Sequence, residues 1–558
     1  MKKTLVLVLS ILMLVTQLAG CSADKETSGG SSTENSVSTS MPDTKPEDAS
    51  NFNATGYPIV KEKVVYKVMN QIPPNGFNWS SEEQSFLKAM KNLTNIDFEF
   101  SNIPSTDWVT KMNLSLAAND LPHIYMSDVT DGNRNTNITT YGIKGGLLVD
   151  LSKGIHEYMP NLLKWFQKEP LAEKILYESN GAIYTLPGIS MTATNAATTL
   201  FYRKDFMNEA GITEEPKTID EFYTMGKAIA DKHAGDPEFS AILPYSVVHF
   251  NNHFERTILA GLGDYTTSEF HDDGTGKVFY NGTSEQYYRY LEFANKLYKE
   301  KILNNEFYTL DTATITAMTK ANKTAVTTNG TMLTQENFGE GEYGLALFSP
   351  LTSEYTSEKK IYGRTGANRS GYVITNKCND EDVASLLRWL DVVYSEEDVA
   401  PGLNNISSWL GVRGETWDYT DDTHTEYKMI IPKDYSLSAT EFNLQKAAPG
   451  SIYAINFMAI VSGASPGLKV KGEQSIEKIF PYEVRPFPLT FLSYTDEEND
   501  IYNTAYTDIK KYVDQMKAKF ITGVEPLTNY GQYCETLEKM GLSKVIEVVQ
   551  ASYDRFNK

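Results

Sequence analysis

The chain has 558 residues, which is too long for a single hydrophobic core and favours about two to four domains. It carries 72 acidic and 51 basic residues, a formal net charge of −21, which disfavours nucleic acid and anionic membrane surfaces as partners. Because 41% of the residues are hydrophobic, most of the chain can fold, and three cysteines are too few for a disulfide framework.

The N-terminus has the pattern of a secretory leader. Lys2 and Lys3 precede an apolar run over residues 4–15, which is too short to span a bilayer comfortably. The leader ends in the residues LAGC, and a small residue before Cys21 resembles the bacterial lipobox, in which the Cys thiol is acylated. We expect residues 1–20 to be a lipoprotein signal peptide and Cys21 to carry the lipid. The alternative is an ordinary signal peptide with an incidental Cys.

Residues 21–57 have the composition of a flexible tether. They are rich in Ser, Thr, Gly, Asp and Lys, and such a stretch cannot bury enough apolar surface to order itself. Apart from the leader, the sequence contains no run of the ~20 apolar residues that a spanning helix needs. We therefore expect a folded body on the extracellular face of the cell membrane, anchored through Cys21. Cys378 and Cys534 are expected to be small packing residues.

Beyond residue 60, short apolar runs alternate with amphipathic segments. A β-branched run at residues 64–68 and an alternating run at 96–100 predict strands, and residues 121–126 predict a third. Between them, residues 81–93 and 108–118 place apolar side chains at helical spacing. This alternation favours an α/β lobe with parallel strands.

Turn and cap residues mark two further elements. Asp273-Gly274 lies between apolar residues and predicts a hairpin over residues 270–280. Near the C-terminus, Thr495 to Glu498 form a capping box, and an apolar stripe predicts a long helix that ends at Gly523.

Several segments, in the same order, resemble those of one protein family. Residues 107–122 read DWVTKMNLSLAANDLP, residues 181–187 read GAIYTLP and residues 201–206 read FYRKDF. Further matching segments are residues 211–222, 297–303, 388–391, 519–526 and 553–556. The chain resembles the family 1 extracellular solute-binding proteins, the lipid-anchored receptors of carbohydrate ABC importers, and is most similar to their long Gram-positive subgroup. Each motif is loose, but together they cover residues 60–558.

The resemblance implies the fold class: α/β, in a two-lobe type 2 periplasmic-binding-protein-like fold with an interlobe cleft and a multi-segment hinge. Lobe 1 would comprise residues 58–188 and 366–415, and lobe 2 residues 189–365 and 416–558. The family pattern places the crossings between the lobes near residues 187–199, near residues 362–372 and after Trp417. A ligand would favour the closed arrangement, because only there does it touch both lobes.

The same resemblance implies a function. The protein would be an extracellular solute-binding lipoprotein that captures a carbohydrate, with an oligosaccharide favoured, and delivers it to the permease of an ABC transporter. It would act as a monomer, without enzymatic activity. Two alternatives stay open: a receptor for a peptide or another non-sugar solute, and a surface glycan-processing enzyme, for which no pair of carboxylates stands out among the 72 acidic residues.

A sugar receptor needs aromatic platforms for apolar C–H faces and fixed polar groups for hydroxyls. From their positions after strands or in loops of the family pattern, the predicted ligand contacts are Asn78, Trp79, Asp128, Asn329, Arg364, Arg369 and Trp409. For Trp79 the alternative is packing, and for the two arginines it is bracing of the hinge. Near Asn329, Met332 stands where the family often has an aromatic residue, which weakens a stacking platform there.

Other chemical motifs are weak. The residues GASPG at 463–467 match a nucleophile elbow, but no His follows them in the chain. His249 and His253 have the spacing of a metal pair, yet no third ligand is near, so a polar helix start is favoured. Residues 131–135 open like an EF-hand loop, but its positions 6 and 12 are Thr136 and Gly142, and neither fits. Residues 231–237 are poor in the oxygen ligands that Ca²⁺ needs. We therefore expect no metal and no cofactor.

Overall fold

In the computed structural model of the chain, the described residues run from 50 to 558 with several gaps. The gaps are residues 73–75, 128, 130–136, 191–199, 266–268, 273, 329–343, 364–365, 370–371, 396–405, 408, 423, 425, 437, 450–453, 456–459 and 462–465. The predicted leader, Cys21 and most of the predicted tether thus lie outside the described residues. Within the described part, no helix is long and apolar enough to cross a membrane.

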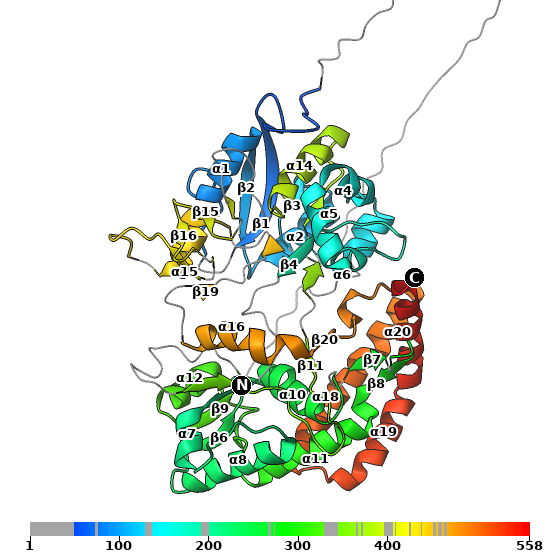
Figure 1. The fold of residues 1–558 in the computed structure, drawn as a ribbon. Helices are drawn as coiled ribbons and strands as arrows, with labels where there is room; N and C mark the ends of the chain where they lie inside the picture. The colour runs from blue at the N-terminus through cyan, green and yellow to red at the C-terminus, as the bar shows by residue number, and fades with distance from the viewer. Residues whose placement is uncertain are drawn as a thin grey trace, which may run out of the picture. The chain divides into compact units, whose positions relative to one another are not determined.

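The first lobe is built on a four-stranded sheet with the order β13-β3-β1-β2. β1 (Val64–Ile72) runs parallel to β2 (Ile96–Pro104) over their whole nine-residue length, and β3 (Ile124–Tyr125) is parallel to β1. β13 (Val373–Ile374), which comes from much later in the chain, pairs antiparallel with β3. The predicted parallel α/β pattern is therefore confirmed, and Figure 1 shows β1 and β2 beside α1 (Ser85–Thr94).

Helices cover this sheet. They are α1, α2 (Trp108–Ala118), η1 (Ile138–Lys144), α4 (Ser152–Tyr158), α5 (Pro160–Lys168), α6 (Pro170–Lys174) and α14 (Asp380–Val392). The predicted helix at 108–118 has the observed bounds, whereas α1 begins four residues later than predicted. Ser80 Oγ accepts a hydrogen bond from the Glu82 amide (3.2 Å) and stabilises a turn there instead. Trp389 of α14 packs edge-on against Phe98 at the centre of the core, with ring centroids 4.9 Å apart.

The second lobe has its own four-stranded sheet, β10-β5-β9-β6. β6 is parallel to β9, and β5 is antiparallel to both β9 and β10. The elements up to the last of these strands are β5 (Phe201–Arg203), α7 (Lys204–Glu209), α8 (Ile219–Lys232), β6 (Ser240–Leu243), α9 (Val247–His249), η3 (Phe250–Glu255), α10 (Arg256–Gly261), β7 (Phe270–Asp272), β8 (Val278–Tyr280), η4 (Asn281–Thr283), α11 (Glu285–Lys299), α12 (Thr312–Lys320), β9 (Thr324–Thr327) and β10 (Leu345–Leu347). The predicted hairpin is confirmed, because β7 and β8 pair antiparallel.

The C-terminal part completes the second lobe with helices. These are α16 (Pro466–Lys478), η7 (Phe480–Tyr482), η8 (Leu489–Phe491), α17 (Asp496–Ile501), η9 (Tyr502–Tyr506), α18 (Thr507–Thr522), η10 (Leu527–Asn529), α19 (Tyr530–Lys539) and α20 (Leu542–Phe556). The predicted capping box is present, since Thr495 and Glu498 bond each other's backbone amides. Gly523 ends α18 in the left-handed conformation, with φ 76°. The expected single long helix is interrupted only by the π-helical turn η9.

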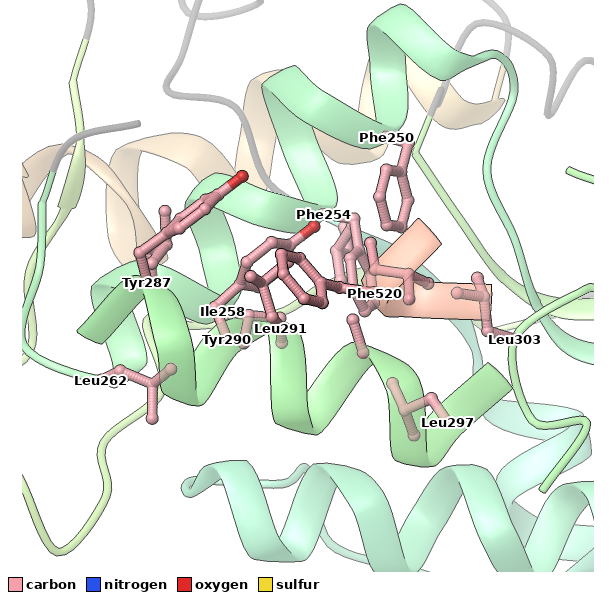
Figure 2. Close-up of a cluster of buried hydrophobic side chains, with 14 of the residues drawn as sticks. Phe250, Phe254, Ile258, Leu262, Tyr287, Tyr290, Leu291, Leu297, Leu303 and Phe520 are labelled. Carbon is pink, nitrogen blue, oxygen red and sulfur yellow. The ribbon is translucent and has the colours of Figure 1, made fainter. Parts of the chain in front are cut away.

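The core of the second lobe lies where η3, α10, α11 and α18 meet. Figure 2 shows Phe254, Leu291 and Phe520, one from each of three of these helices, gathered in one cluster. The Asn295 amide on α11 donates to the Phe520 carbonyl on α18 (2.8 Å), which ties the two helices together. Burial of this apolar surface is the main source of stability of the lobe, and it also fixes the face of η3 and α10 that is left for solvent and ligand.

Three segments far apart in the sequence join in one small sheet, β12-β4-β18. They are β4 (Pro187–Ser190), β12 (Ala367–Arg369) and β18 (Ala454–Ile455). A second pair, β11 (Ile361–Tyr362) with β20 (Glu483–Val484), runs parallel. The chain leaves the core of the first lobe after Ile189 and enters that of the second at Leu200, so these strands lie along the stretches where crossings are expected.

Residues 406–461 contain a series of short elements. They are β14 (Ile406–Ser407), β15 (Gly411–Val412), β16 (Trp417–Tyr419), β17 (Glu426–Met429), α15 (Ala439–Phe442), η6 (Asn443–Ala447) and β19 (Ile460–Val461). The Gln84 amide at the start of α1 donates to the Leu444 carbonyl (2.7 Å), and Lys446 pairs with Glu83. These contacts favour placing residues 439–447 with the first lobe, although we expected them in the second. The lobe boundaries given above otherwise stay a prediction.

Candidate functional site

Ligands of open α/β sheets bind outside the carboxyl ends of the parallel strands, so those ends define the candidate site in each lobe. In the first lobe, residues 76–80 follow β1 and residues 126–127 follow β3. The Gln71 amide of β1 donates to Ser127 Oγ (2.8 Å), and Ser127 Oγ donates to the Met126 carbonyl (2.6 Å). The first of these bonds joins the two strand ends at the edge where ligand would lie, and the second orients the Ser127 hydroxyl.

Trp79 lies in the core of the first lobe and is only 5% exposed. Its ring packs edge-on against Phe100, with centroids 6.0 Å apart. Asn102 on β2 fixes its backbone, accepting from the Trp79 amide (2.9 Å) and donating to the Trp79 carbonyl (3.3 Å). The structure therefore favours the packing alternative for Trp79, whereas its neighbour Asn78 is exposed.

Arg369 is a buried brace in this structure. Its guanidinium donates to Glu178 (3.0 Å), to the Phe491 carbonyl (3.2 Å) and to the Ile175 carbonyl. The Arg369 and Glu178 side chains are 2% and 4% exposed, so the pair is shielded from solvent. Since its donors are already engaged, the structure favours bracing of the crossing segments over ligand binding, the alternative that the sequence left open.

The remaining predicted ligand contacts are not brought together within the described residues. Trp409 is 37% exposed in a turn between β14 and β15, a position accessible to a ligand. Asp128, Asn329 and Arg364 lie outside the described residues.

In the second lobe, the carboxyl ends of β6 and β9 lie side by side. The Tyr245 amide after β6 donates to Thr328 Oγ1 after β9, at 2.9 Å. Ser246 caps the next helix, because its Oγ accepts from the His249 amide (3.2 Å). The helical segment α9-η3-α10 thus starts at the carboxyl ends of β6 and β9, and its first residues lie beside the candidate site.

His249 and His253 stack on each other on this segment, with ring centroids 5.2 Å apart and planes 14° from parallel. His249 Nδ1 is hydrogen-bonded to Ser246 Oγ (2.9 Å), and Tyr245 packs edge-on against the His249 ring. Burial lowers the pKa of His249, and the nearby Lys471 ammonium lowers it further. The geometry agrees with a polar helix start. Among the described residues, no three His, Cys, Asp or Glu side chains are grouped to hold a metal ion.

Two basic side chains join this surface that sequence reasoning did not single out. Arg256, at the first turn of α10, lies over the Tyr362 ring of β11, with its Cζ 3.9 Å from the ring centroid. Lys471, on α16, is half-buried, and burial lowers its pKa. Neither residue belongs to a motif, and a lysine or arginine on an amphipathic helix is ordinarily a solvated charge, so the sequence carried no signal for them.

Asp236, in one of the two segments considered for calcium (residues 231–237), is paired with a lysine. Asp236 is bonded to the Lys323 ammonium (2.6 Å), and Glu238 lies 3.6 Å from the same ammonium. Hydrogen bonding to Lys323 lowers the pKa of Asp236. Lys323, the residue before β9, thus neutralises charge on these carboxylates.

Comparison with known proteins decides the family. A family model described as bacterial extracellular solute-binding protein matches residues 78–400, more than half of the chain. The chain belongs to this family. The resemblance inferred from the sequence motifs is thereby confirmed.

Members of the family resemble the chain over nearly its whole length. The fructooligosaccharide ABC transporter substrate-binding protein FusA from Streptococcus pneumoniae is 23% identical over 531 residues, covering 89% of this chain and 91% of FusA. A solved structure of FusA with kestose has a TM-score of 0.65 at 20% identity, covering 88% of this chain and 99% of that one.

A second solved structure is similar to a comparable extent. The HMO-binding, ABC-transporter-associated solute-binding protein from Bifidobacterium longum infantis has a TM-score of 0.70 at 18% identity, covering 89% of this chain and 99% of that one. The family therefore has the two-lobe α/β fold that the sequence predicted, and this chain shares it.

Proposed function

We propose that the protein is an extracellular receptor that captures an oligosaccharide and delivers it to the permease of an ABC transporter. The observation that carries the proposal is the similarity to FusA, which extends over 91% of that fructooligosaccharide-binding protein. Polar side chains that are not buried follow strand ends in both lobes, Asn78 after β1 in the first and Tyr245 after β6 in the second, and such groups can bind hydroxyls.

Binding in such a receptor is a population shift. A ligand that contacts both lobes stabilises the arrangement in which both sets of groups reach it, and the permease recognises that arrangement. No covalent step is required, so the receptor would release its ligand unaltered, in contrast to a glycan-processing enzyme. Asn78 and Trp409 are our proposed contacts among the described residues, because both side chains are exposed.

Calorimetry against a panel of oligosaccharides tests this function. We expect at least one oligosaccharide to bind with a Kd in the micromolar range or tighter, and to be recovered intact by chromatography after incubation. A matched panel of oligopeptides is the control. Binding of peptides without any oligosaccharide would overturn the carbohydrate assignment, and recovery of shortened sugars would identify an enzyme instead.

We further propose that Cys21 carries the lipid that anchors the mature chain, with residues 22–57 as the tether. Cys21→Ala should abolish lipid attachment, because alanine has no thiol to acylate, and should release the protein into the medium or leave it as an unprocessed precursor. Metabolic labelling with a fatty acid and fractionation of cells measure both effects. The control is Cys534→Ala, a half-buried cysteine that should keep the label in the membrane fraction. Equal labelling of the two variants would contradict the anchor.

A further inference from the structure

Four nitrogen-bearing side chains lie along or beside the helical segment α9-η3-α10 of the second lobe. His249 and His253 stack on each other, Lys471 lies close enough to His249 to influence its charge, and Arg256 follows His253 by three residues. We call His249, His253, Arg256 and Lys471 the basic row. It begins at the carboxyl ends of β6 and β9 and ends at Tyr362, beside the strand pair β11-β20.

Two members of the basic row lack a counter-charge. Lys471 makes no hydrogen bond through its ammonium and no ion pair within the described part of the chain. Arg256 forms no ion pair with any carboxylate described in the structure, and its Nε is buried without a hydrogen-bond partner. The Tyr362 ring attracts Arg256 but carries no counter-charge, and a partly buried cation without a counter-charge gives up hydration that such a contact only partly offsets.

The nearby acidic groups are engaged elsewhere. Glu255 adjoins Arg256 in sequence but lies in the core, where its carboxylate is 2.8 Å from the Lys517 ammonium. Glu269, which acts on Tyr362, is paired with Lys510 at 2.6 Å. Among the described residues, the basic row is therefore a local excess of positive charge, on a chain whose net charge is −21.

We propose that the basic row binds an anionic group of the ligand, so that the captured oligosaccharide carries carboxylates or sulfates. This inference rests on the proposed function, and it narrows the substrate class. An anionic group bound at the basic row would supply the counter-charge that the described residues do not, and guanidinium groups bind carboxylate and sulfate oxygens with paired hydrogen bonds. A neutral sugar would leave both cations uncompensated when the site closes, which lowers its affinity relative to a charged one.

Pairs of oligosaccharides that differ only in charge test this inference separately from the proposed function. The probes are uronate-containing oligosaccharides, each compared with its carboxyl-reduced form, and sulfated oligosaccharides, each compared with its desulfated form. Each pair keeps linkage and length and differs only in charge. We expect calorimetry to show binding of one charged class and at least ~10-fold weaker binding of its neutral counterpart. The class that binds identifies the source of the anion.

Substitutions in the basic row test which side chains bind the anionic group. Lys471→Met should weaken binding of the charged oligosaccharide ~10-fold or more, and Lys471→Arg should restore most of it because the charge returns. Arg256→Gln should act in the same direction. Lys511→Met is the matched control, since Lys511 is 69% exposed on α18 and its loss changes the net charge equally. Thermal unfolding of each variant separates lost binding from lost folding.

The outcomes are distinct. Equal affinity for charged and neutral partners, or an effect of Lys471→Met no larger than that of Lys511→Met, overturns the inference while leaving carbohydrate binding in place. Binding of neither class, in a protein that unfolds cooperatively, overturns the inference together with the proposed function. Salt dependence gives a further check: the charged ligand should lose affinity as ionic strength rises, because its attraction to the basic row is screened.

Discussion

Replacing Lys517 with methionine is expected to lower the free energy of unfolding by about 3–5 kcal/mol. The Lys517 ammonium lies 2.8 Å from the Glu255 carboxylate, and the two side chains are 4% and 1% exposed. Asn251 Oδ1 accepts a second bond from the same ammonium at 3.1 Å. Methionine fills a similar volume but removes the ammonium that pairs with the buried Glu255 carboxylate, in the core around Phe254 and Tyr290 (Figure 2).

Urea unfolding measures the effect, and two further variants control it. Lys511→Met removes an exposed charge from the same helix and should cost less than ~1 kcal/mol. Adding Glu255→Gln to Lys517→Met removes the buried carboxylate charge and should recover a large part of the loss. A single variant as stable as the Lys511 control would contradict this account.

Replacing Arg369 with methionine should have a comparable effect, about 3–5 kcal/mol, for a different structural reason. Arg369 connects β12 to the residues before β4 through Ile175 and Glu178, and to the segment before α17 through Phe491. The substitution removes the ion-pair partner of Glu178, which is 4% exposed, and the hydrogen bonds that connect three stretches near the predicted crossings between the lobes. We expect lower stability and, because the crossings position the lobes, weaker ligand binding as a secondary result.

Comparison of stability with affinity distinguishes a brace from a ligand contact. Arg369→Lys keeps a charge beside Glu178 but loses the planar fork, so it should recover only part of the stability. If Arg369 braces the crossing segments, every variant that lacks the guanidinium group should have a lower free energy of unfolding in the absence of ligand. If Arg369→Met weakened binding while leaving the stability of the free protein unchanged, Arg369 would be a ligand contact, as the sequence first suggested.

The elements of the fold that depend on local sequence were predictable. Alternation at residues 96–100, the capping residues Thr495 and Glu498, and Gly523 with its positive φ gave strands, a helix start and a helix end that the structure contains. The start of α1 was predicted four residues too early. Hydrophobic periodicity does not show that Ser80 Oγ accepts a hydrogen bond from the Glu82 amide, which stabilises a turn before Ser85.

The candidate site was predictable only in outline. Family motifs predict which loops face the ligand, but they do not show which side chains are free to reach it. Trp79 and Arg369 are engaged in packing and ion pairing, and the bonds that engage them come from Asn102 and Glu178, at distant positions in the chain. Lys471 and Arg256 belong to no motif, so the sequence did not predict them as site residues. Only the packing of helices places Lys471 near His249, on the helical segment that also carries Arg256.

The sequence alone determined the class of this protein, an α/β body with the motifs of a solute-binding family, and it also predicts a secretory leader, a lipid anchor at Cys21 and a polar tether. These properties follow from local composition, periodicity and order along the chain. Only the tertiary structure decided which charges are compensated. Whether Lys517 meets Glu255, or Lys471 meets no carboxylate among the described residues, depends on which helices pack together, and charge compensation acts between side chains hundreds of residues apart.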